Sequence, residues 1–186
     1  MRIVLSITVS VACGTKNSEP GKKTEVVSKD NLRSKINEVN SFIDSLNDAK
    51  YNNIKDKIIQ DKIQAQRVLN KTDATENEVS NAKTTLEKAL EKAKLDKLKV
   101  NLKELIEKAE TLDQAGLNQE LKTKLTSKIT ESKGFVSSAT STRVEIEGST
   151  SSLKSVIKEV ELEILKNKSI EEVKVELQNQ LMLQKN

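Results

Sequence analysis

Few residues in this chain have the types and spacing that catalysis needs. Its 186 residues include no His, one Cys and five scattered Gly, while 32% of them are charged. These counts exclude a His-based catalytic triad, imidazole metal ligands, an internal disulfide and a thiolate metal cluster. Carboxylate pairs are frequent, but they lie among lysines on helix faces, where solvated surface is the better explanation. We therefore expect no enzyme activity, no metal and no cofactor.

The residue that could carry a chemical modification is Cys13. It follows Arg2 and an apolar run over residues 3–12, in the sequence MRIVLSITVSVAC. A basic start, a short apolar stretch and small residues before a cleavage site are typical of a secretory signal. The run is too short for a permanent membrane-spanning helix, so we expect residues 1–12 to be a signal peptide.

This segment also resembles a bacterial lipoprotein signal, in which SVAC is the lipobox and Cys13 becomes the acylated first residue. Ser10 stands where Leu is usual, a departure that is familiar in spirochaetal lipoproteins. The resemblance implies a membrane anchor on Cys13, because each buried CH₂ of an acyl chain contributes ~0.8 kcal/mol. A plain secretory signal and an ordinary buried Cys are the alternatives.

The rest of the chain has to form the surface on which any ligand binds, and the spacing of its apolar residues predicts helices. Residues 13–29 contain the only Pro and lack apolar periodicity, which predicts a flexible tether. From residue 30 onward, apolar side chains recur at spacings of three and four, the pattern of an amphipathic helix. A second helix is predicted over residues 51–70. The first apolar stripe consists of Leu32, Ile36, Val39, Ile43 and Leu46.

The helical pattern occurs twice. Residues 65–90 and 132–157 align at an offset of 67, and both contain a T-x-x-E capping box, formed by Thr75 with Glu78 and by Thr142 with Glu145. Residues 76–112 contain neither Gly nor Pro. They therefore predict one helix of ~55 Å, at 1.5 Å per residue, that ends the first unit and begins the second.

The predicted fold class is all-α, with two tandem three-helix bundles that share this long continuous central helix. The bundles are expected over residues 30–95 and 96–167, followed by a short C-terminal helix over residues 168–186. Ser169 and Glu172 offer a third capping box for that helix. Its apolar residues are Ile170, Val173, Leu177 and Leu181.

The sequence AQRVLNKTDATENEVSNAKTTLEKALEKAK resembles the FIVAR-type three-helix module of bacterial surface proteins, whose pattern runs A-x-x-VL, T-x-x-EV and A-x-x-x-L-x-x-AL. The first copy matches over residues 30–95, and the second is degenerate, with Ser149 where Ala is expected. Behind a lipobox, in a chain rich in Lys, Asn and Ile, the repeat is also similar to helical surface lipoproteins of Borrelia. That resemblance implies an outer-membrane, surface-exposed protein that binds a complement regulator, plasminogen, fibronectin or a matrix glycan.

Basic side chains form the first candidate binding surface. At 100° per residue, Lys50, Lys57 and Lys71 fall on one outward stripe with Arg67 beside it, and Lys124 and Lys128 occupy the corresponding helix of the second copy. Such a stripe would attract a polyanion or an acidic protein face, although solubility alone would also explain it. Nucleic acid is not an expected partner, because the net charge is only +4 and aromatic residues make up 2% of the chain.

Ile59 and Ile63 form the second candidate surface, because they lie off the apolar stripe of their helix. We expect the C-terminal helix to fold back over them; the alternative is an exposed contact for a partner.

Three functions are compatible with these patterns. They are a surface-anchored binding lipoprotein, a structural or antigenic coat lipoprotein without a high-affinity ligand, and a periplasm-facing helical assembly factor. The ligand, the membrane leaflet and the oligomeric state are left open by the sequence.

Overall fold

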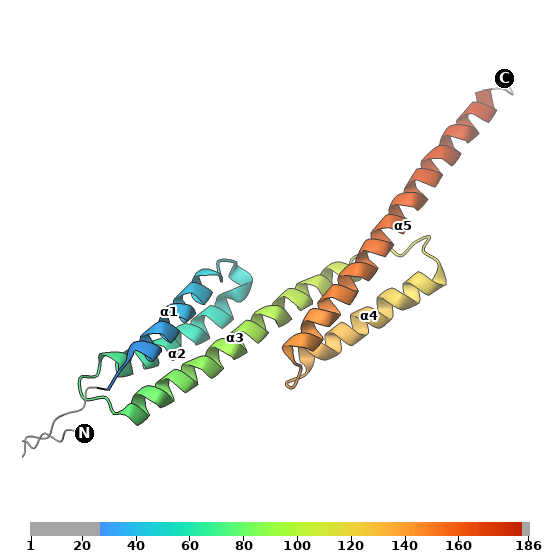
Figure 1. Cartoon of the computed structure of the whole chain (residues 1–186). Helices are drawn as coiled ribbons and strands as arrows, with labels where there is room; N and C mark the ends of the chain where they lie inside the picture. Colours follow the sequence, from blue (N-terminus) through green and yellow to red (C-terminus); the bar gives the residue numbers. More distant parts are fainter. Residues whose placement is uncertain (1–26, 184–186) are drawn as a thin grey trace, which may run out of the picture.

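The computed structural model describes residues 27–183, which form helices joined by short connections and, over that range, no strand. The predicted signal peptide, Cys13 and most of the predicted tether lie outside the described residues. Figure 1 shows the helices grouped side by side in two clusters along an elongated molecule. They are α1 (Asp30–Asp44), the 3₁₀ turn η1 (Ala49–Tyr51), α2 (Asn52–Asn70), α3 (Glu76–Glu110), α4 (Gln119–Ser137) and α5 (Arg143–Leu183).

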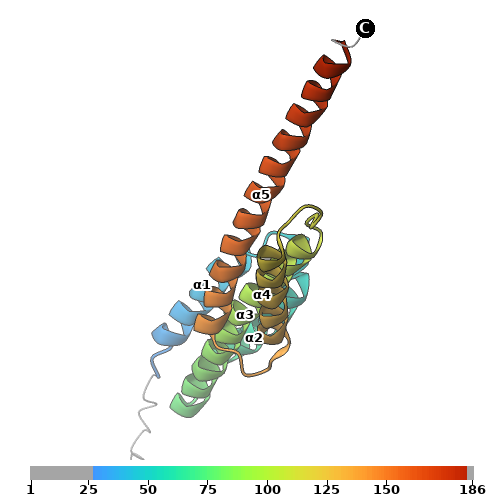
Figure 2. The same ribbon diagram turned by 90° about the vertical axis from the view of Figure 1, so that its right-hand side faces the viewer.

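The helices build two three-helix bundles that share α3. Bundle 1 consists of α1, α2 and the first half of α3, and bundle 2 of the second half of α3, α4 and the first half of α5 (Figures 1 and 2). Each bundle has its own apolar core. The predicted fold class, with a long shared central helix, is therefore confirmed. The most deeply buried core residues are Leu32, Val39, Ile58, Leu86 and Leu90 in bundle 1, and Leu102, Leu125, Ile146, Leu153 and Val160 in bundle 2.

Both predicted capping boxes are present, one at the start of the third helix of each copy. The Glu78 N–H donates to Thr75 Oγ1 at 3.2 Å, and the Thr75 N–H donates to Glu78 Oε2 at 2.8 Å. The same pair of bonds joins Thr142 and Glu145, at 3.3 and 2.7 Å. Each box satisfies two backbone donors that the first turn of a helix leaves free, so α3 and α5 begin where the sequence predicts.

The middle of α3 belongs to both bundles. Residues 94–101 are all half-buried. Leu95 and Leu98 pack against the core of bundle 2, whereas Val100, further along the helix, still packs against the core of bundle 1. The two cores therefore overlap along the helix axis, and this overlap predicts that the two bundles are coupled in unfolding.

The predicted separate C-terminal helix is wrong. α5 runs for 41 residues without a break, from Arg143 to Leu183, so residues 168–183 continue the last helix of bundle 2. The sequence between Gly148 and Leu183 contains no Gly and no Pro to end a helix. Ser169 and Glu172 cannot form a capping box there, since backbone N–H groups inside a helix are already bonded to carbonyls one turn earlier.

The prediction that this segment covers Ile59 and Ile63 is also wrong. The residues expected to make that contact are exposed, and the end of α5 that carries them projects away from bundle 1 (Figure 2). Ile59 is half-buried and packs against the core of bundle 1, and Ile63 is half-buried as well. Both side chains are thus partly covered within their own bundle, which removes the need for an additional helix.

Over residues 27–183, no helix combines the length and apolar character that crossing a membrane requires.

Candidate binding surfaces

The predicted basic stripe does not form a continuous surface, because its members lie on different elements and most have carboxylate partners. Lys50 belongs to η1 rather than to α2, and its Nζ lies 2.8 Å from Glu104 Oε2 on α3. Its hydrogen bond to Glu104 raises the pKa of Lys50 above the usual range. Lys50 therefore ties the α1–α2 connection to α3.

Lys71 follows the end of α2 and is similarly paired. Its Nζ lies 2.7 Å from Glu78 Oε1, at the capping box that begins α3. The hydrogen bond from Lys71, with the backbone N–H of Thr75, lowers the pKa of Glu78 to about 2. This pair links the end of one helix to the start of the next.

The remaining basic candidates are scattered over both bundles. On α4, Lys124 pairs with Glu159 at 2.6 Å and Lys128 with Glu131 at 2.6 Å. Arg67 donates to the side chain of Gln64 at 3.2 Å. Lys57 is exposed beside a groove of about 390 Å³ between α2 and α3, with Ile54, Ile58, Ala89 and Ala93 among the residues that line it.

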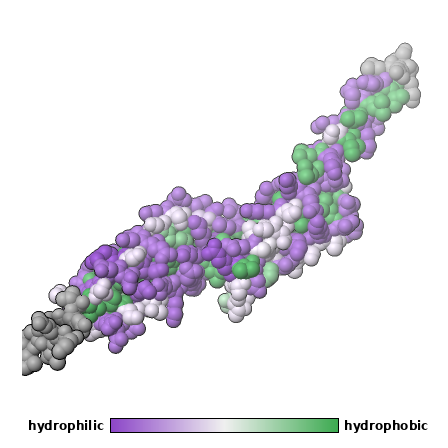
Figure 3. Space-filling view, in the orientation of Figure 1, coloured by the Kyte–Doolittle hydropathy of each residue, from purple (hydrophilic) through white to green (hydrophobic). Residues whose placement is uncertain are grey.

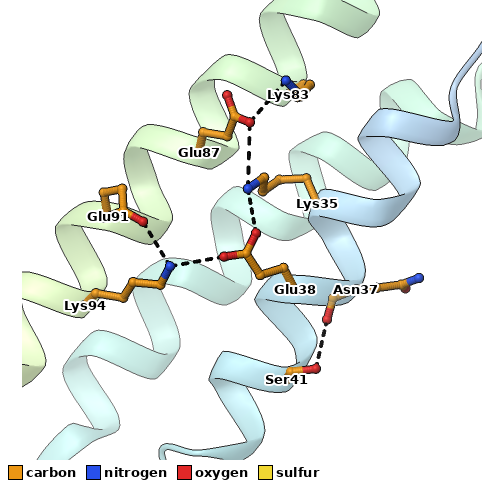
Figure 4. Close-up of polar contacts among 8 residues, drawn as sticks. All are labelled: Lys35, Asn37, Glu38, Ser41, Lys83, Glu87, Glu91 and Lys94. Carbon is orange, nitrogen blue, oxygen red and sulfur yellow. Dashed lines mark hydrogen bonds and ion pairs between the residues drawn. The ribbon is translucent and has the colours of Figure 1, made fainter.

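A second set of ion pairs fastens α1 to the first half of α3 (Figure 4). Lys35 lies between Glu38 at 2.5 Å and Glu87 at 3.7 Å, and Lys94 lies between Glu91 at 2.9 Å and Glu38 at 3.1 Å. The hydrogen bonds from Lys35 and then Lys94 lower the pKa of Glu38. Lys83 lies 3.1 Å from Glu87, so three lysines face three glutamates and this face presents no strong net potential.

The most concentrated group of unusual side chains lies where the bundles meet. We call this region the waist and define it by Phe42, Tyr51, Lys97, Leu98 and Arg143. Lys97 Nζ lies 5.8 Å from the centre of the Phe42 ring and 5.3 Å from that of Tyr51. Both distances are within the reach of a cation–π interaction. The Tyr51 hydroxyl also bonds the side-chain oxygen of Asn101 on α3, which fixes the ring in place.

Lys97 differs from the two other basic residues around this region, Lys94 and Arg143, in how its charge is satisfied. Its Nζ donates to the carbonyl oxygen of Ser45 at 3.3 Å and to its hydroxyl at 3.2 Å, and it has no ion-pair partner among residues 27–183. By contrast, Lys94 pairs with two carboxylates and Arg143 pairs with Glu147 at 2.8 Å.

A shallow hollow of about 270 Å³ lies at the waist, with Phe42, Lys94, Lys97, Leu98 and Arg143 around it. Cations beside an aromatic ring suit a carboxylate or sulfate group on a larger ligand.

Sequence reasoning did not single out Lys97 or Arg143. Lys97 lies 52 residues from Ser45 and 55 from Phe42 in the sequence, and helical periodicity carries no information on such distant contacts. The sequence feature that could have pointed to this region is the rarity of aromatic residues. Tyr51 is the only Tyr and Phe42 one of two Phe in the chain, and both lie close to the connection between the first and second helices.

The other conspicuous surface is apolar and lies at the far end of α5. We call residues 166–183 of α5 the tail. Figure 3 shows hydrophobic side chains along this projecting helix. Four of them recur at spacings of three and four and form what we call the tail stripe: Ile170, Val173, Leu177 and Leu181, which are 52%, 66%, 57% and 50% exposed.

Comparison with known proteins agrees with this architecture. The family model for the FIVAR domain matches the chain twice, over residues 28–94 and 99–161, one match for each bundle. The predicted twofold repeat of this module is thereby confirmed. No curated protein and no solved structure shows significant similarity to the chain.

Proposed function

The chain belongs to the FIVAR domain family, of which it carries two copies, and on this premise we propose that it is a lipid-anchored surface protein that binds an acidic host ligand. The ligand classes are those that the sequence resemblance implies: a complement regulator, plasminogen, fibronectin or a matrix glycan. Binding takes place on the helical surface and involves no chemical step. FIVAR domains often occur in surface proteins, which supports this location.

The elongated shape is compatible with an anchor at one end. α1 begins at one end of the molecule, and α5 ends at the other (Figure 1). Cys13 and the predicted tether precede α1 in the sequence. A lipid on Cys13 would therefore hold the start of α1 nearest to the membrane and leave the waist and the tail further out, where a large ligand has access.

The waist is the contact surface that we propose for the ligand, and Lys97 is the observation that supports it. Most other basic candidates already have a carboxylate partner, whereas Lys97 has none among residues 27–183. An incoming carboxylate or sulfate could pair with Lys97 without breaking an existing ion pair. The neighbouring rings of Phe42 and Tyr51 offer apolar contact area next to the charge.

Lys97→Gln is expected to weaken binding to a heparin column and to the host protein captured from serum by about fivefold, because one exposed ion pair is lost. The matched control is Lys88→Gln, which removes the same charge from an exposed position on the same helix, away from the waist. Retention of the two variants and the wild type is compared at several salt concentrations. Equal weakening in both variants would mean that net charge, and not the waist, accounts for the binding.

Cys13→Ser is expected to release the protein from membranes while leaving its helical content unchanged, because residue 13 precedes the folded bundles. Metabolic labelling with palmitate should mark the wild-type protein and not the variant. Protease treatment of intact cells should then remove the wild-type protein. Absence of label on the wild-type protein would contradict the lipid anchor, and protection from protease would favour the periplasm-facing assembly factor.

A structural coat lipoprotein is the second candidate, and the balance of surface charges favours it. Ion pairs join α1 to α3, the α1–α2 connection to α3, and α4 to α5. A surface whose charges are neutralised in this way serves a spacer or shield as well as it serves a receptor. Failure of the wild-type protein to capture any serum or matrix component would select this function over the first.

A further inference from the structure

The tail leaves bundle 2 as a single helix with an uncovered apolar face. Val160 is the last fully buried residue of α5, and Ile164 is half-buried against the core of bundle 2. Beyond it, the tail stripe and its neighbours are exposed along the projecting part of the helix (Figures 2 and 3). Apolar residues scattered singly on a surface are ordinary, but a row of them on one face of a lone helix indicates a missing partner.

The tail repeats the pattern of the first helix of each bundle. Each of the three segments has an apolar residue, a Glu two positions later, and apolar residues three and seven positions after the first. In bundles 1 and 2 the apolar members are covered by helices of the same bundle. The sets are Ile36, Glu38, Val39 and Ile43 in α1; Leu102, Glu104, Leu105 and Ala109 in α3; and Ile170, Glu172, Val173 and Leu177 in the tail.

The point where the tail leaves bundle 2 also matches the point where α3 leaves bundle 1. At the first junction, the connection before α2 holds α3 through Lys50 and Tyr51. At the second, the Asn167 side chain donates to the carbonyl oxygen of Gly116 at 3.1 Å, and Gly116 adopts φ 76°, which suits Gly. The hydrogen bond to Gly116 therefore holds the tail in the position that the first helix of a further module would take. Over residues 27–183, no second or third helix packs against it.

We propose that the tail is a self-association element, on which the tail of a second copy of this chain packs in antiparallel orientation. Pairing position n with position 351 − n puts Ile170 of one copy opposite Leu181 of the other. Val173 of one copy then lies opposite position 178 of the other, one residue away from Leu177. The stripe is therefore complementary to itself when read in the opposite direction, and each copy covers the same face of the other.

The charges of the tail favour antiparallel pairing with the tail of a second copy. Lys166 and Lys168 lie at its base, whereas the last turn of α5 carries no basic residue; the next basic residue in the sequence, Lys185, lies outside the described residues. An antiparallel partner brings the negative C-terminal end of its helix dipole next to those two lysines. Parallel pairing would instead place the two C-terminal ends together. The end of the partner tail would also reach the cavity of about 740 Å³ at the base of the tail, whose lining includes Ile164, Lys168 and Ile170.

A lipid surface fits the tail less well than a second copy does. Three basic residues, Lys166, Lys168 and Lys174, are balanced by three acidic residues, Glu171, Glu172 and Glu176. Helices that lie on anionic membranes carry an excess of basic residues on the polar face. The stripe is short, so we expect the dimer to form with a Kd on the order of 10–100 µM, the range of small and readily reversible interfaces.

The test compares two double variants of the full chain, both carrying Cys13→Ser to exclude a disulfide or lipid effect. Val173→Glu with Leu177→Glu puts two charges on the tail stripe. Val175→Glu with Met182→Glu puts the same charges elsewhere on the tail, since Val175 lies about 200° round the helix from Val173. All four residues are exposed, at 66%, 57%, 54% and 70% respectively, so neither variant should disturb the bundles.

Sedimentation equilibrium from 5 to about 500 µM should show a monomer–dimer equilibrium for the Cys13→Ser chain and the control variant. The stripe variant should be monomeric, with self-association weakened about a hundredfold or more. Far-UV circular dichroism should give equal helical content for all three. A monomeric parent chain over this range, or equal dimerisation of the two variants, would overturn the proposal.

Orientation is tested by disulfide formation in the same Cys13→Ser background. A mixture of the Ile170→Cys and Leu181→Cys chains should form a disulfide between the two variants, whereas each variant alone should form little. Efficient disulfide formation by each variant alone would overturn the antiparallel arrangement. These measurements use neither lipid nor host ligand, so failure here leaves the proposed function standing, and failure of the function leaves this proposal standing.

Discussion

In the Leu95→Pro variant, both bundles are expected to lose stability and to unfold as separate units, at lower temperatures than the wild-type chain, with the free energy of unfolding reduced by ~3 kcal/mol or more. Proline removes a backbone hydrogen bond and clashes with the preceding turn. At this position the damage falls inside the 35-residue helix α3, which no Gly or Pro otherwise interrupts.

The expected loss reaches both bundles because the affected segment packs against both cores. Leu95 and Leu98 contact the core of bundle 2, and Val100 contacts the core of bundle 1. A kink at residue 95 displaces the last turns of α3 that belong to bundle 1 relative to those that belong to bundle 2. We therefore expect the continuous helix to be the element through which one bundle stabilises the other.

Thermal unfolding followed by far-UV circular dichroism measures the effect, and Leu95→Ala is the matched control. Alanine removes the side chain but keeps the helical backbone, so the difference between the two variants isolates the break in α3. An unchanged ellipticity and midpoint in Leu95→Pro would contradict the existence of one helix over residues 76–110.

The elements that the sequence predicted correctly are those determined by local chemistry. The T-x-x-E pairs of Thr75 with Glu78 and Thr142 with Glu145 define helix starts because the turn preceding each pair leaves the first backbone donors free. The long helix follows from the absence of Gly and Pro. Ser169 with Glu172 has the same spacing but lies inside α5, so the pattern alone does not establish a helix boundary.

The ion-pair partners of the basic candidates could not be predicted, because they depend on contacts between distant parts of the chain. Lys50 and Lys124 belong to an outward basic stripe on a helical wheel, yet each meets a carboxylate from another helix in the folded structure. Lys97, which has none among the described residues, came to notice only when α1, η1 and α3 were brought together. Periodicity gives the direction of a side chain and not its partner.

The second copy differs from the first inside its core, and the structure gives the physical reason. Ser149, which departs from the FIVAR pattern, is buried, and its hydroxyl lies 2.8 Å from that of Ser132. The equivalent residues of bundle 1 are Ala65 and Ala82. Two buried hydroxyl groups that bond each other avoid the cost of an unsatisfied polar group, so the paired change preserves the packing of two small residues.

Coupling between the bundles leads to the second large effect, which involves two equivalent core residues. Leu86 in bundle 1 and Leu153 in bundle 2 are 1% and 0% exposed and occupy the same position in the repeat. Leu→Ala at either site is expected to lower the free energy of unfolding by ~2–5 kcal/mol, through lost burial and the cavity left behind. The equivalence of the two sites makes each variant the control for the other.

Tyr51 allows the two bundles to be observed separately, because it is the only Tyr in a chain without Trp and it packs in the core of bundle 1. In the wild-type background, Leu153→Ala should lower the unfolding midpoint of the Tyr51 fluorescence signal, although the cavity lies in the other bundle. In the Leu95→Pro background, the same substitution should leave that midpoint unchanged, because the damaged α3 no longer transmits the loss. If Leu153→Ala fails to shift the Tyr51 signal even in the wild-type background, the bundles unfold independently and α3 is only a connector between them.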